Sequence, residues 1–128
     1  MRSDYPKIAR ESFFPEGTVI PAAPGIDVSP ISFELKKKAW VQVSMLLFAG
    51  HDGSANVANT YMGATVDGMS LNYANVAYEA RAFVPLVITL VRVLLLSQGI
   101  HIAKYNVQTA LANVLTTHSP TGLVVVEL

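Results

Sequence analysis

One apolar run most constrains what this chain can fold into: AFVPLVITLVRVLLL, from Ala82 to Leu96. It is shorter than the roughly 20 residues that a membrane-spanning helix needs, and it contains Pro85 and Arg92, which disfavour such a helix. The run is rich in β-branched side chains, which favour an extended backbone. We therefore predict a buried β-strand, with Pro85 at its start, at an edge or at a bulge.

In a second segment, AWVQVSMLLF, apolar residues occupy every second position, as they do in a half-buried strand. HDGSANVAN is typical of a loop, and TYMGATV of a strand that runs into a tight turn at Asp67-Gly68. The residues that we expect on the apolar face of the first of these strands are Val41, Val43, Met45 and Leu47.

The C-terminal part continues the β pattern. A turn at Ser97-Gln98-Gly99 is predicted to join the apolar run to IHIAKYNVQ as a hairpin. A loop follows at Thr109 to Asn113, and SPTG at Ser119 to Gly122 turns the chain into its last strand, GLVVVEL. Chain ends normally fray in water, so a final segment this apolar indicates an interior strand.

These strands and the length of 128 residues predict a single antiparallel β-sandwich. The candidate for a helical turn is SLNYANVAY, from Ser70 to Tyr78, but its asparagines disfavour a helix.

Residues 1–30 have a different character. They hold five of the seven prolines and show no sustained period, which predicts an extended arm before a sandwich domain at residues 31–128. A loosely attached tail is the alternative. The arm is too apolar to be purely solvated, so we expect it to dock on a neighbouring protein through Tyr5, Ile8, Phe13, Phe14 and Ile20.

Composition excludes several functions. Nine basic and nine acidic residues cancel, which argues against binding to nucleic acid or an anionic membrane. Cysteine is absent, so disulfides and thiolate metal sites are excluded. The N-terminal segment MRSDYPKIARESFF lacks the apolar core of a secretory signal. Because only 14% of the residues are charged and 52% are hydrophobic, we expect an apolar surface that meets a partner.

Candidate metal sites are weak. Asp52, Ser54 and Asn56 have the alternating oxygen ligands of a calcium loop, but the glycine and glutamate of that loop do not follow, so a plain surface loop is favoured. The three histidines, His51, His101 and His118, lack the spacing of a metal motif. We predict ordinary hydrogen-bonded or solvated histidines, and neither a metal nor another cofactor.

The remaining residue patterns that could indicate catalysis or binding fit structural roles better. No nucleophile elbow, P-loop, dinucleotide fingerprint or zinc-protease helix occurs, so no catalytic residue is predicted. Lys36-Lys37-Lys38 is the one charge run; it fits a solvated loop better than a phosphate contact. Trp40 favours a core or interface position over stacking on a base or sugar.

The C-terminal half resembles a known family. A proline-led apolar strand, a glycine turn, a strand carrying Gly99, His101 and Lys104, and a closing strand that ends in Glu-Leu together resemble the trimeric jelly roll of tumour necrosis factor and complement. The resemblance covers roughly residues 31–128 and is closest to bacteriophage head decoration proteins, head fibres and tail-fibre tips. It implies a homotrimer with the last strand near the threefold axis, and an interface formed by Leu123, Val124, Val125, Val126 and Leu128.

The resemblance implies a non-enzymatic protein that decorates the outer surface of a viral head and binds the major capsid protein. The alternative is the receptor- or glycan-binding tip of a phage fibre, for which Tyr61, Tyr73, Tyr78 and the HDGSAN loop are the candidates. An enzyme on a cupin-like jelly roll is a third hypothesis, disfavoured because the histidine spacing does not fit.

Overall fold

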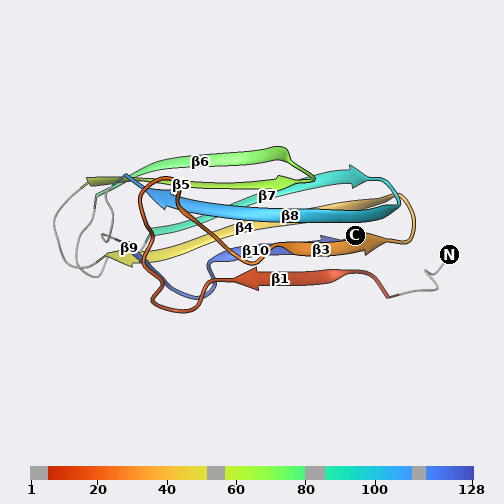
Figure 1. The fold of residues 1–128 in the computed structure, drawn as a ribbon, viewed down its shortest axis with the longest axis horizontal. Coiled ribbons are helices and arrows are strands. Elements are labelled where there is room, and N and C mark those ends of the chain that lie inside the picture. The colour runs from red at the N-terminus through yellow and green to blue at the C-terminus, as the bar shows by residue number, and fades with distance from the viewer. Residues whose placement is uncertain (1–5, 52–56, 80–85, 111–114) are drawn as a thin grey trace.

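The computed structural model describes residues 6–51, 57–79, 86–110 and 115–128. In these segments the chain forms β-strands and no helix, and therefore no helix that could span a membrane. The strands run along the long axis of the molecule in two layers (Figure 1).

The strands are β1 (Ala9–Phe13), β2 (Ile26–Asp27), β3 (Ile31–Leu35), β4 (Ala39–His51), β5 (Val57–Val66), β6 (Met69–Glu79), β7 (Leu86–Leu96), β8 (Gly99–Thr109), β9 (Leu115–Thr117) and β10 (Gly122–Glu127).

Two antiparallel sheets make the sandwich. The first sheet has the order β1-β10-β4-β7, with β9 also paired to β4; the second has the order β2-β8-β5-β6, with β3 also paired to β8. The chain repeatedly crosses from one sheet to the other, as in a jelly roll. The predicted all-β jelly-roll sandwich is therefore confirmed.

Alternation along the strands builds the core between the sheets. Val41, Val43, Met45 and Leu47 of β4 are buried, as predicted, and face the buried Met62, Val66, Tyr105 and Val107 of the second sheet. Each such side chain contributes about 1.5–3 kcal/mol by leaving water.

The turn at Asp67-Gly68 is also confirmed. It connects β5 and β6, which pair as a hairpin, and both residues have positive φ, 53° and 79°. A two-residue turn of this kind matches the twist of paired strands. The segment Ser70 to Tyr78 lies within β6, so it is a strand and not a helical turn.

The predicted hairpin at Ser97-Gln98-Gly99 is wrong. β7 pairs with β4 in the first sheet, whereas β8 pairs with β5, β2 and β3 in the second. Leu94 and Leu96 of β7 and Ala103 of β8 are all buried in the same core. The short connection therefore passes from one layer to the other, because both strands turn their buried faces toward the interior.

The N-terminal segment is extended, as predicted, but it forms part of the sandwich. β1 pairs with β10 along its whole length, and β2 pairs with β8. Phe14 and Ile20 have exposed fractions of 6% and 0%, and both belong to this chain's own core. The expectation that these two side chains dock on another protein is therefore wrong, because the two sheets already enclose them.

The other predicted docking residues have different positions. Ile8 packs partly buried against the core, and Phe13 is half-buried at the end of β1. Tyr5 lies outside the described residues. Docking of Ile8, Phe13 and Tyr5 on a partner stays a prediction.

Candidate oligomer interface

The outward side of the first sheet is apolar along β4 and β7. Residues directly opposite each other in an antiparallel pair point to the same side of the sheet. Trp40 is opposite Leu95, and Phe48 is opposite Val87. The exposed fractions of Trp40, Leu95 and Val87 are 53%, 45% and 63%. Large apolar side chains thus face solvent at both ends of the strand pair.

The middle of the pair has the same character. Val91 and Val93 of β7 are 48% and 46% exposed, and they lie opposite Ser44 and Gln42. None of the outward-facing residues of β4 from Trp40 to Phe48, or of β7 from Val87 to Leu95, is charged. A sheet face that meets only water normally carries polar side chains.

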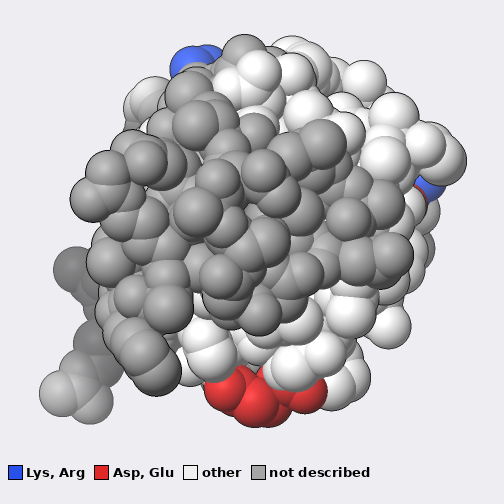
Figure 2. Space-filling model, turned by 90° about the vertical axis from the view of Figure 1, so that its left-hand side faces the viewer, with Lys and Arg blue, Asp and Glu red and all other residues white. Residues whose placement is uncertain are grey.

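Charge is sparse on another side of the molecule too. In the end-on view of Figure 2, one acidic patch lies at the lower edge, and the part of this end that the structure describes is otherwise mostly uncharged.

β10 continues the apolar surface. Val124 and Val126 are half-buried and lie opposite Ser44 and Gln42 of β4. Leu128 is 50% exposed, and its backbone N–H donates to the Trp40 carbonyl at 2.9 Å. β10 lies between β1 and β4, which confirms that it is an interior strand of its sheet.

The predicted interface residues therefore divide by alternation. Leu123 and Val125 are fully buried between the sheets, so their assignment to a trimer interface is wrong. Contact of Val124, Val126 and Leu128 with a second subunit stays a prediction.

A small hollow marks one end of this surface. It has a volume of about 100 Å³ and is lined mainly by Leu46, Phe48, Val87, Thr89 and Pro120. We use the name apolar face for the outward residues of the first sheet: Trp40, Leu46, Phe48, Val87, Val91, Val93, Leu95, Val124, Val126 and Leu128.

The histidines have structural partners. His101 is buried, its Nδ1 lies 2.6 Å from Asp67 Oδ2, and its Nε2 lies 2.7 Å from the Ser97 carbonyl. Burial alone would lower the pKa of His101, but the hydrogen bonds to Asp67 and Ser97 and the Asp67 charge raise it above its ordinary value. The hydrogen bond from His101 lowers the pKa of Asp67.

A second pair connects the N-terminal segment to the turn before β10. His118 Nδ1 lies 2.8 Å from Glu16 Oε1, and the Ser119 N–H donates to Glu16 Oε2 at 2.6 Å. The hydrogen bond with His118 is the main cause of a lowered pKa of the exposed Glu16, and the hydrogen bond from Ser119 lowers it further. The described residues contain no cluster of histidine and acidic side chains that could hold a metal ion.

The remaining predicted residues are placed as follows. Lys36, Lys37 and Lys38 are exposed between β3 and β4, which confirms the solvated loop. Lys36 Nζ pairs with Glu34 at 2.9 Å. Trp40 is not a core residue, and its interface role stays a prediction.

For several predicted positions, the structure describes either no atoms or only the backbone. Asp52 to Asn56 are outside the described residues. His51, Tyr73 and Tyr78 lie within β4 and β6, but only their backbone is described. Tyr61 is half-buried on the outward side of β5.

Comparison with known proteins identifies the fold class. No protein-family model matches the sequence, and no curated protein matches it. Among solved structures, the chain is similar to Eiger TNF from S. frugiperda, with a TM-score of 0.52, 12% identity, and coverage of 97% of this chain and 94% of that one. The predicted similarity to the tumour-necrosis-factor jelly roll is therefore confirmed at the level of the fold.

Two larger proteins contain a similar unit. Dimeric latent PorU from Porphyromonas gingivalis gives a TM-score of 0.58 at 8% identity, over 94% of this chain and 12% of that one. A chain of the T13 IBDV viral particle gives 0.52 at 10% identity, over 95% and 31%. The chain thus spans a small part of either protein, and similarity at these identities shows the fold alone.

The sequence contained a signal for the apolar face that our interpretation did not use. The run from Leu86 to Leu96 is apolar on both sides of a strand, from which we predicted a buried strand. β7 lies at the edge of its sheet, one of the positions considered for Pro85, and one of its sides faces solvent. Apolar residues on that side indicate a surface that another molecule covers.

Proposed function

We propose that this protein is a non-enzymatic structural protein of a viral particle that associates as a homotrimer through the apolar face. The observation that supports the proposal is the exposure of Trp40, Val87, Val91, Val93 and Leu95 on one uncharged surface. A monomeric protein in water rarely leaves a surface like this uncovered. A closed cyclic assembly covers it in every copy.

The energetics fit such an assembly. These side chains are about half exposed, so covering each one contributes on the order of 1 kcal/mol. Six residues of the apolar face are exposed to this degree in each of the three copies: Trp40, Val87, Val91, Val93, Leu95 and Leu128. The sum, on the order of 18 kcal/mol, is comparable to the cost of the two association steps of a trimer, each about 4–15 kcal/mol.

The position of the face agrees with the family resemblance. It belongs to the sheet that contains β10, which the resemblance puts near the threefold axis. The hollow beside Leu46 and Phe48 offers a place for a side chain of the neighbouring copy. The second sheet then faces outward from the trimer.

The viral role rests on a different observation. A chain of the IBDV particle contains a unit of similar fold. We place the trimer on the outer surface of a capsid, that of a bacteriophage head, where it decorates the lattice and binds the major capsid protein. No cofactor, membrane or nucleic acid takes part.

The solution mass tests the assembly. We expect light scattering to give the mass of a trimer for the unmodified protein and of a monomer for the double variant Val91→Lys, Val93→Lys. The matched control is Ile100→Lys, Ile102→Lys, which places two lysines at exposed isoleucines of the second sheet and is expected to stay trimeric. A monomeric unmodified protein, or a trimeric Val91/Val93 variant, contradicts the proposal.

The capsid assignment has its own test. An antibody against this protein is expected to label the outer surface of intact particles in electron micrographs. Label confined to free protein contradicts a role in the particle while leaving the trimer result unaffected.

A further inference from the structure

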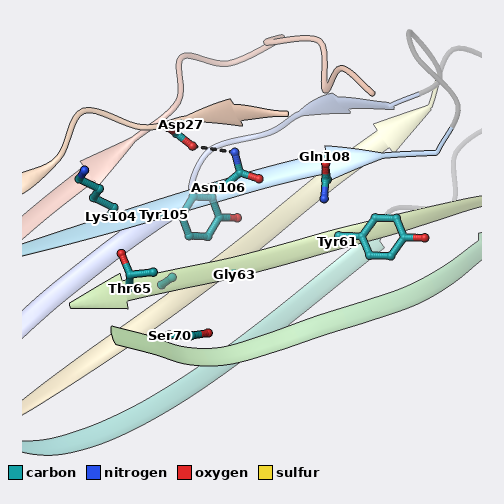
Figure 3. A pocket seen from close by; sticks show the side chains of 10 residues that line it. Asp27, Tyr61, Gly63, Thr65, Ser70, Lys104, Tyr105, Asn106 and Gln108 are labelled. Carbon is teal, nitrogen blue, oxygen red and sulfur yellow. Dashed lines mark hydrogen bonds between the residues drawn. The ribbon is translucent and has the colours of Figure 1, made fainter. Parts of the chain in front are cut away.

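A groove of about 320 Å³ lies on the outward side of the second sheet, opposite to the apolar face (Figure 3). Tyr61, Gly63 and Thr65 of β5 line it, because Met62 and Ala64 between them turn into the core. The groove is also lined by residues of the three neighbouring strands: Asp27 of β2, Ser70 of β6, and Lys104, Asn106 and Gln108 of β8.

The floor of the groove is a glycine. Gly63 lies opposite Asn106 of β8, and the pairing of β5 with β6 shifts between Gly63 and Thr65. A glycine inside a strand and a bulge beside it both mark places where another molecule or backbone approaches closely. Gly63 does not have a positive φ, so the turn geometry that requires glycine elsewhere does not explain this one.

Polar groups surround this floor, and one of them is fixed in place. Asn106 Nδ2 donates to Asp27 Oδ1 at 2.6 Å and to the Pro24 carbonyl at 3.1 Å (Figure 3). Within the described part of the chain, the side chains of Thr65, Lys104 and Gln108 make no hydrogen bond or ion pair. These groups are therefore free to bind a ligand.

The groove continues beyond Tyr61. An adjoining hollow of about 460 Å³ shares Tyr61 and Gln108 and is also lined by Ala22, Ala23 and Ala110. Along β8 the two hollows extend from Lys104 to Thr109, roughly 17 Å at about 3.3 Å per residue. A ligand of several units fits this length better than a single small molecule.

The chemistry of the groove selects the ligand class. β5 and β8 are interior strands, so they offer no free backbone edge to an extended peptide. One lysine and one aspartate line the first hollow, which gives no net charge for a phosphate backbone. Amide, hydroxyl and ammonium groups beside a tyrosine ring suit a molecule with many hydroxyls and apolar ring faces.

We propose that this groove binds an oligosaccharide. One sugar ring lies against Gly63, which has no side chain of its own, and a second packs beside the Tyr61 ring. Gln108 and Thr65 hydrogen-bond to sugar hydroxyls, and Lys104 binds a hydroxyl or a sugar carboxylate. The proposal is independent of the trimer, because the groove lies on the other sheet.

NMR titration tests the binding. Lactose, chitotriose and sialyllactose serve as probes. Each is added to the full-length protein at concentrations of up to several millimolar, because weak ligands bind with affinities in this range. We expect at least one of them to shift the backbone amides of Gly63, Thr65 and Asn106 in a saturable manner. Preference for sialyllactose over lactose assigns the carboxylate to Lys104, and the variant Lys104→Gln removes that preference.

Two variants distinguish the groove from other surfaces. Gly63→Val fills the floor with a side chain that strands favour, and it is expected to weaken binding at least about tenfold. Glu34→Gln, on the same side of the second sheet but outside the groove, is expected to leave the affinity unchanged. The proposal is overturned if none of the three saccharides shifts these amides, or if Gly63→Val binds as well as the unmodified protein.

Discussion

Asp67 and His101 connect two turns that are far apart in the sequence. The Asp67 carboxylate accepts from His101 through Oδ2 at 2.6 Å and from the Ile102 N–H through Oδ1 at 2.9 Å. On the other side of the ring, His101 Nε2 donates to the Ser97 carbonyl at 2.7 Å. One imidazole thus joins the β5–β6 turn to the β7–β8 connection between the sheets. Both of its nitrogens face acceptors, which is the arrangement that a protonated histidine satisfies.

This pair predicts that stability falls at alkaline pH. The folded state raises the pKa of His101 above its ordinary 6.5, so its contribution is fully present below that value and is lost as the pH rises through the folded pKa. The Asp67 pKa is lowered from 3.8, so its contribution is lost only as the pH falls through that lowered pKa. We expect the free energy of unfolding, measured with urea, to decrease as the pH rises above the ordinary histidine value of 6.5 and through the higher folded-state pKa of His101.

The variant Asp67→Asn isolates the pair. Asparagine tolerates the positive φ of this position and keeps a hydrogen-bonding side chain, but it removes the charge. We expect this variant to lose most of the stability decrease across that pH range. An unchanged decrease would show that other groups cause it.

Tyr105 predicts an effect on contact between the sheets. It belongs to the second sheet, is 1% exposed, and its hydroxyl donates to the Leu46 carbonyl of the first sheet at 2.9 Å. Burial raises the pKa of Tyr105 well above its ordinary value, so the hydroxyl stays protonated. We expect Tyr105→Phe to lower the free energy of unfolding by about 1 kcal/mol. Ser70→Ala, which removes an exposed hydroxyl, should change it by less than about 0.5 kcal/mol.

The sequence was sufficient to predict strands whose two sides differ. β4 alternates between Val41, Val43 and Met45 on one side and polar or partly exposed residues on the other, so its core side could be assigned in advance. The Asp67-Gly68 turn was equally clear, because its two residues tolerate positive φ. Local chemistry alone determines such features.

Features that depend on the partner of a strand could not be predicted in this way. The apolar residues of β7 and β10 do not show which side faces the core, and Leu123 and Val124 looked equivalent although only Leu123 is fully buried. Phe14 looked like a docking residue because nothing in the sequence shows that β1 pairs with β10. The groove on the second sheet forms only where β2, β5, β6 and β8 lie side by side. Of its lining residues, only Tyr61 could therefore be predicted from the sequence as a candidate for glycan binding.

Phe14 predicts how strongly the N-terminal segment supports the fold. Its ring lies 6.1 Å from that of Tyr105, centroid to centroid, in an edge-to-face arrangement, and its N–H donates to the Thr121 carbonyl at 2.9 Å. We expect Phe14→Ala to lower the free energy of unfolding by about 3–5 kcal/mol, because it opens a cavity in the core. Phe13→Ala, at a half-buried neighbour, should cost much less. Equal, small losses would mean that the segment contributes little to stability.

Gly122 predicts how closely β1 must approach β10. Its φ is +154°, and a Cβ there would collide with the Ser12 carbonyl oxygen and lie 2.8 Å from the Phe13 Cα, both backbone atoms of β1. Gly68 also has a positive φ, of +79°, but a Cβ there would meet nothing within 4 Å. Gly68→Ala therefore tests backbone strain alone, with an expected loss of about 1 kcal/mol in the free energy of unfolding. Gly122→Ala adds a backbone collision that no side-chain rotation relieves, so we expect a clearly larger loss.

We also expect hydrogen exchange to become faster at the amides of β1 and remain unchanged in β5 and β6. If the two variants are equally destabilised and β1 stays protected, β1 can move away from β10 at little cost, and the close pairing of these two strands is not what holds the N-terminal segment in place.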